Sequence, residues 1–144
     1  MVEVLIAGIL LASALAAVSR ISVAALSGSA RLSDRARIEA AINDNIQTMQ
    51  KEDSYYTDGW IIQNGGAEAL QNACTNPPDA LSKHLQSVAP QPREAAIKRS
   101  FDISAVPGIL RIIYSFEGPE QQVNEEKRMI EMNPNFAAKC YSTQ

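Results

Sequence analysis

Few side chains in this chain of 144 residues have the types and spacing that chemistry requires. His84, the single histidine, falls on the apolar face of an expected helix, and no nucleophile pairs with it. We interpret it as a packed or partly exposed histidine rather than a catalytic base. The two cysteines lack the Cys-x-x-Cys spacing of zinc sites, and Gly65-Gly66 is too short for a phosphate-binding loop. We therefore predict no catalytic residue, no metal site and no cofactor, and a protein that is not an enzyme.

Cys74 and Cys140 are instead interpreted as a disulfide of an exported domain. The bond would close a loop of about 65 residues and stabilise the fold by roughly 4 kcal/mol through loss of chain entropy in the unfolded state. Two free buried thiols in a cytoplasmic domain are the alternative. The arginines that follow the first apolar segment favour that alternative under the positive-inside rule, unless a basic leader precedes this sequence.

A group of basic residues could contact an anion: Arg93, Lys98, Arg99 and Arg111. The formal net charge is −3 and the isoelectric point is about 5.1, which excludes a general nucleic-acid-binding surface. We interpret the group as a solvated face, with weak contact to DNA or another anionic surface as the alternative.

One long helix is expected to position the rest of the chain. Residues 1–19 contain a single charged group, Glu3, and at about 1.5 Å per residue would match the hydrocarbon thickness of a bilayer. The basic start of a cleavable signal peptide is absent from this segment. The helix should continue to about residue 51, because residues 20–51 contain no proline. A narrow apolar stripe marks its second half: Ile38, Ile42, Ile46 and Met49.

The predicted fold class is α+β, with two parts. Residues 1–29 are predicted to form an apolar transmembrane helix, and Gly28, flanked by two serines, is its weak point. Residues 30–144, which we call the head, comprise a helix over 30–51, a connecting region over 52–97, and an antiparallel sheet and tail over 98–144. The apolar stripe should pack against this sheet.

Within the connecting region, residues 55–66 are predicted to form an ordered loop because glycine pairs interrupt them. Short helices are expected over residues 67–74 and from Pro77 onward, with Asn76 as the N-cap of the second. The apolar face of that second helix should carry Leu81, His84, Leu85 and Val88.

Strands are expected in the last third of the chain. Alternating apolar and polar residues predict a strand over residues 100–105, and Pro107-Gly108 suits a type II turn that leads into a second strand over 109–116. A third strand is expected over residues 126–133, and Phe136 begins a tail.

The segment Val2-Glu3-Val4-Leu5-Ile6 resembles the start of a mature type IV pilin or pseudopilin. That family typically reads Phe-Thr-Leu-(Val/Ile)-Glu-(Leu/Val) and continues into an apolar run. Family members carry the glutamate as the fifth residue after cleavage, whereas here it is the third, so we expect that two residues and the leader precede this sequence. Many members also have a helix-kinking proline, which is absent from this helix.

The resemblance implies a structural subunit that polymerises into a pilus on the bacterial surface, for adhesion, motility or DNA uptake, with the helix over residues 1–29 in the filament core. Its implied partners are other copies of itself, the inner membrane before assembly, the pilus assembly machinery and other pilins. A pseudopilin of a type II secretion system is one alternative. A single-span anchored binding module that never polymerises is another.

Glu3 and Met1 are the predicted assembly residues. A carboxylate held in lipid is costly unless it is neutralised or paired. In a filament the nearest cation would be the amino terminus of a neighbouring copy at Met1. Such a pair would penalise any register that leaves Glu3 alone. A water-exposed Glu3 at the membrane interface, with no role, is the alternative.

Overall fold

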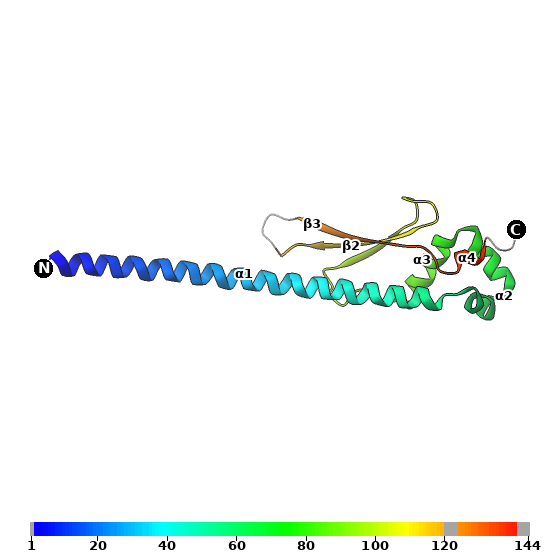
Figure 1. The fold of residues 1–144 in the computed structure, drawn as a ribbon, viewed down its shortest axis with the longest axis horizontal. Coiled ribbons are helices and arrows are strands. Elements are labelled where there is room, and N and C mark those ends of the chain that lie inside the picture. The colour runs from blue at the N-terminus through cyan, green and yellow to red at the C-terminus, as the bar shows by residue number, and fades with distance from the viewer. Residues whose placement is uncertain (1, 120–123, 141–144) are drawn as a thin grey trace. The chain divides into compact units, whose positions relative to one another are not determined.

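The structure of the protein is a computed structural model that describes residues 2–119 and 124–140, with side chains from Ile6 onward. Its elements follow one another in the order shown in Figure 1: α1 (Val2–Tyr55), α2 (Asp58–Thr75), α3 (Pro77–Val88), β1 (Lys98–Asp102), β2 (Leu110–Glu117), β3 (Glu125–Met132) and α4 (Ala137–Cys140). The chain divides into two compact units, residues 1–37 and residues 38–144. Helix α1 contributes to both.

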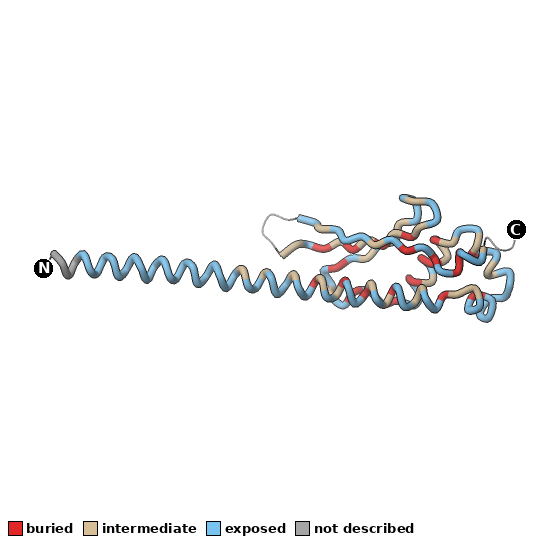
Figure 2. Tube along the Cα trace, viewed as in Figure 1, coloured by how far each residue is buried: buried red, intermediate tan, exposed pale blue. Residues whose placement is uncertain are grey.

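The first unit is the apolar half of α1. Every described side chain from residue 6 to residue 27 is exposed, as the pale blue part of the helix shows in Figure 2. An 18-residue window of this helix has a mean hydropathy of 2.0 and contains no buried residue, and the helix is long and apolar enough to cross a membrane. Hydroxyls along it donate to carbonyl oxygens one turn earlier, from Ser13, Ser19, Ser22 and Ser27. These serines therefore satisfy their own hydrogen bonds in an apolar environment.

The second unit is an α+β domain, which confirms the predicted fold class. Its sheet has the order β1-β2-β3 with both pairs antiparallel. Burial alternates along β2, and the inward residues Leu110, Ile112 and Tyr114 are fully buried. Helix α1 packs on this face through the predicted stripe, in which Ile42 and Met49 are fully buried.

An ion pair also joins α1 to the sheet. Arg128 on β3 donates to Glu39 on α1 at 3.1 Å.

The first strand begins and ends earlier than predicted. β1 ends at Asp102, because the carboxylate of Asp102 accepts hydrogen bonds from the backbone N–H and the hydroxyl of Ser104 and so turns the chain. Ile103, expected on the buried face of the strand, is 37 % exposed. The turn that follows is confirmed, since Gly108 has a φ of +79° and the Ile109 N–H donates to the carbonyl of Val106 at 3.2 Å.

The loop predicted over residues 55–66 is wrong, because this segment is almost entirely helical. α1 extends to Tyr55 and α2 begins at Asp58. Thr57 is the N-cap of α2, with a hydroxyl that accepts from the Trp60 N–H at 3.2 Å, and Asp58 lies favourably near the positive end of the helix dipole. The glycine pair only kinks the helix, at Gly66, where φ is +79°.

Helix α3 starts at Pro77 as predicted, although Asn76 makes no side-chain capping hydrogen bond. Leu81 and Leu85 are fully buried, but Val88 is 45 % exposed because the helix ends there and the chain turns away. The described part of the predicted tail is not without structure: it includes the short helix α4.

Candidate functional site

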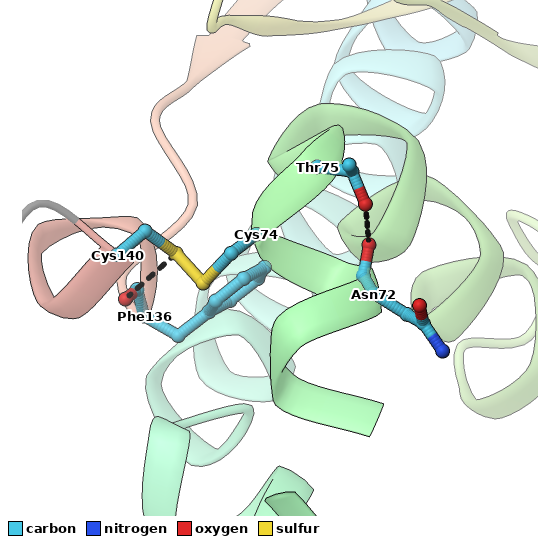
Figure 3. The surroundings of a disulfide bond; sticks show 5 residues. All are labelled: Asn72, Cys74, Thr75, Phe136 and Cys140. Carbon is cyan, nitrogen blue, oxygen red and sulfur yellow. Dashed lines mark hydrogen bonds between the residues drawn. A yellow bond between two sulfur atoms is a disulfide. The ribbon is translucent and has the colours of Figure 1, made fainter. Parts of the chain in front are cut away.

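The two cysteines form the predicted disulfide. Cys74 at the end of α2 and Cys140 at the end of α4 have a Cα–Cα separation of 5.5 Å and lie 66 residues apart in sequence (Figure 3). The bond therefore closes the polypeptide around α3 and the whole sheet. Closing a loop of this length strongly reduces the conformational entropy of the unfolded chain. In the chain-entropy model this stabilises the folded state by about 4 kcal/mol.

Two further contacts fasten the segment that leads to this bond. Phe136 is 1 % exposed and meets the ring of Tyr56 edge-on, with 5.3 Å between ring centroids. The Asn135 N–H donates to the carboxylate of Asp53 at 3.3 Å. Burial raises the pKa of Asp53, and this hydrogen bond opposes the rise. The carboxyl-terminal segment is thus fixed to the end of α1 by packing and a hydrogen bond, and to the end of α2 by the disulfide.

Of the three residues predicted to matter for assembly, the structure describes Gly28 in full and Glu3 by its backbone. The backbone of Glu3 belongs to the first turn of α1, but its side chain, like all of Met1, lies outside the described residues. α1 runs without interruption through Gly28, where a Cβ atom would meet nothing within 4 Å. A glycine is therefore not required there by packing within this chain, and the proposed weakness of this point during assembly stays a prediction.

The interpretation of the basic residues as a single solvated face is wrong for Arg99. Its guanidinium reaches into the domain, where it donates to the backbone carbonyls of Ala89 and Pro90 and to the side-chain oxygen of Asn45. It also lies 5.2 Å from the centre of the Phe101 ring. Burial lowers the pKa of Arg99.

Two of the other basic residues lie beside carboxylates. Arg111 pairs with Glu131 on the neighbouring strand at 2.8 Å, and Arg93 lies 4.0 Å from the carboxylate of Asp44. Both arginines are therefore beside a carboxylate that offsets their charge.

Asn45 is the polar centre of the second unit, and the sequence analysis did not identify it. It is 4 % exposed, and its side-chain oxygen accepts from Arg99 and from the hydroxyl of Tyr114, both at 3.0 Å. Its amide donates to the carbonyl of Pro90 at 2.9 Å. Burial raises the pKa of Tyr114 to about 12. The cluster joins α1, β1, β2 and the segment after α3, and its role is structural.

His84 belongs to an aromatic cluster at the junction of α1, α2 and α3. Its ring stacks on Tyr56 with centroids 4.0 Å apart and an interplanar angle of 12°, and it meets Trp60 edge-on at 5.1 Å. Burial lowers the pKa of His84, and the charge of Glu52 opposes this. The histidine is packed and partly exposed, as the sequence indicated. Within the described ranges, no group of three histidine, cysteine, aspartate or glutamate side chains is arranged to hold a metal ion.

No protein-family model, curated protein or solved structure matches this chain. The architecture is that of a long apolar amino-terminal helix followed by a small antiparallel sheet and a carboxyl-terminal disulfide, which is consistent with a pilin-like protein. Among the described residues, one helix near the amino terminus is apolar and long enough to cross a membrane, which is typical of membrane anchoring or secretion.

Proposed function

We propose that this protein is a structural subunit that polymerises into a type IV pilus-like filament on the bacterial surface. The observation that carries the proposal is the division of α1. One unbroken helix is apolar and exposed over residues 6–27 and packs on an antiparallel sheet over its last turns. Few functions other than membrane anchoring or helix–helix assembly need so long an exposed apolar surface on a disulfide-closed domain.

The apolar half of α1 suits both of the environments that a pilin occupies. A helix that is apolar all round is stable in lipid, and it is equally stable beside other apolar helices, because neither environment leaves its side chains in water. The serines bond within their own helix, so transfer from membrane to filament would leave no hydroxyl without a partner. The subunit would therefore act by assembling with other copies and other pilins, not by catalysis.

In this proposal Glu3 sets the axial register between neighbouring subunits. A carboxylate in an apolar filament core is costly unless a cation pairs with it, and the amino terminus of a neighbouring copy would supply that cation. The inner membrane would hold the subunit first, and the assembly machinery would extract it to the cell surface. Adhesion, motility and DNA uptake all remain compatible with such a filament.

The test is substitution of Glu3 in cells that make the protein, with membrane level and surface filaments measured separately. Glu3→Ala and the neutral near-isostere Glu3→Gln should insert normally into the membrane and lose most filaments. Glu68→Ala, which removes an exposed carboxylate from α2, is the matched control and should assemble normally. Immunogold electron microscopy of shed material would count the filaments. Wild-type filament yield from Glu3→Ala would refute the role of Glu3, and no filament from the unaltered protein would favour an anchored binding module.

A further inference from the structure

A cleft of about 540 Å³ lies between α2 and α3 on the second unit, beside the aromatic cluster. Its volume is within the range of about 300–1,000 Å³ that small-molecule sites occupy. None of the features assigned to filament assembly uses it. The cleft is lined by aromatic rings, which we call the wall, by alanines, and by polar side chains, which we call the rim, and each group limits what could bind there.

The aromatic wall consists of two stacked rings, Tyr56 and His84, and of Trp60, whose ring is inclined to them by 58° and 65°. Tyr56 is 9 % exposed and His84 stacks on it, so these two rings mainly support the wall. Trp60, held edge-on to His84, is 39 % exposed and is the ring that a ligand can reach. Three alanines also line the cleft, and their small side chains occupy little of its space: Ala69, Ala73 and Ala80. A ligand here needs a flat apolar face of its own.

The polar rim carries amides and a neutralised charge pair. Asn72 and Asn76 line the cleft, and no hydrogen bond engages their side-chain amides among the described residues. Figure 3 shows the Asn72 amide directed away from the disulfide. Lys83 donates to Asp79 at 2.7 Å, so the two formal charges on the rim offset each other. A carboxamide both donates and accepts, which suits hydroxyl groups, and the balanced charge favours a neutral ligand.

We propose that this cleft binds a neutral pyranose sugar. The ring of such a sugar has a flat C–H face, which would stack on Trp60, and hydroxyls around its edge, which would bond to Asn72 and Asn76. An anionic ligand would need a basic group without a carboxylate beside it. A cationic ligand would need a carboxylate without a basic group beside it. The proposal does not depend on filament assembly, because the same cleft would serve an anchored module that never polymerises.

The experiment uses the full chain in amine-oxide micelles, since a glycoside detergent would compete for the cleft. Trp60 is the single tryptophan of the sequence, so its fluorescence reports on the cleft directly. Methyl β-galactopyranoside, methyl α-glucopyranoside and N-acetylglucosamine are titrated separately. At least one should give a saturable change with a dissociation constant of about 1 mM, the affinity typical of a ligand with so few atoms. Sorbitol, which has hydroxyls but no ring face, should give none.

Variants test whether binding occurs at this cleft, with saturation-transfer NMR as a readout that does not need tryptophan. Trp60→Leu should abolish the transfer from protein to sugar, and Asn72→Ala should weaken binding about fivefold, the effect of one lost hydrogen bond. Tyr55→Leu and Asn43→Ala, at exposed positions outside the cleft, should bind as the unaltered protein does. Asn72 is itself exposed, so its variant decides the matter even if Trp60→Leu fails to fold.

Four results would overturn the proposal. The first is the absence of a saturable response to all three sugars. The second is a response to sorbitol equal to that of the sugars. The third is binding that Asn72→Ala leaves unchanged. The fourth is tighter binding of methyl glucuronate than of the neutral glucoside, which would contradict the assignment to neutral sugars.

Discussion

Replacing Asn45 by alanine should be among the most destabilising single substitutions in the second unit. The side-chain oxygen of Asn45 accepts from Tyr114 and Arg99, and its amide donates to the carbonyl of Pro90. The loss would leave the fully buried hydroxyl of Tyr114 without this acceptor. Arg99 and Pro90 would still be bonded to each other, at 2.8 Å, so most of the damage would fall on the tyrosine.

The magnitude follows from these bonds. A buried hydroxyl left unsatisfied costs about 1–3 kcal/mol, and a hydrogen bond to a charged group contributes about 1.5–3 kcal/mol. Alanine forms helix better than asparagine by roughly 0.5 kcal/mol, a gain that the control substitution Asn43→Ala shares and that therefore cancels in the comparison. We expect Asn45→Ala to lower the free energy of unfolding by about 3 kcal/mol relative to Asn43→Ala. This control makes the same substitution at an exposed position of the same helix.

Urea unfolding of the fragment that begins at Ala30 would measure the difference, with Trp60 fluorescence as the probe. A double-mutant cycle sharpens the test. Tyr114→Phe alone should cost about 1 kcal/mol, because Asn45 would keep its bond to Arg99. Added to Asn45→Ala it should cost almost nothing, since it removes the hydroxyl that lost its acceptor. Additive losses, or an Asn45→Ala variant as stable as Asn43→Ala, would refute the reasoning.

Three further outcomes are expected. The fragment that begins at Ala30 should be soluble and monomeric and should unfold cooperatively, because it omits most of the exposed apolar half of α1; aggregation under gel filtration would count against this division of the chain. Replacing both Cys74 and Cys140 by serine should lower the free energy of unfolding by about 4 kcal/mol. Peptide maps of native protein alkylated without reductant should show that neither cysteine is modified. NMR titration should give His84 a pKa below 6.5. Its protonation then opposes the folded state, so stability should fall as pH drops from 7 toward 5, and less so in His84→Phe.

The long helix and the main features of the sheet could be predicted because their causes are local. The absence of proline from residues 20–51 and the spacing of Ile38, Ile42 and Met49 determine a helix with one buried stripe. Alternation along residues 110–117 determines which side of β2 faces the core. The loop prediction over residues 55–66 failed on equally local grounds, because Thr57 was not recognised as an N-cap.

The polar interior could not be predicted, because its partners come together only in the folded domain. Arg99 and Asn45 both look like surface residues in the sequence, and they bond to each other across 54 positions. The hydroxyl of Tyr114 lies 69 positions from its acceptor. The aromatic cleft is likewise formed where α2 packs against α3, and no local sequence pattern predicts that packing. The sequence by itself therefore determined the helix, its apolar half and the sheet, whose signals are periodic and short in range. The tertiary structure alone decided which polar groups are buried together, because each hydrogen bond depends on where α1, the end of α3 and the strands bring distant residues in space.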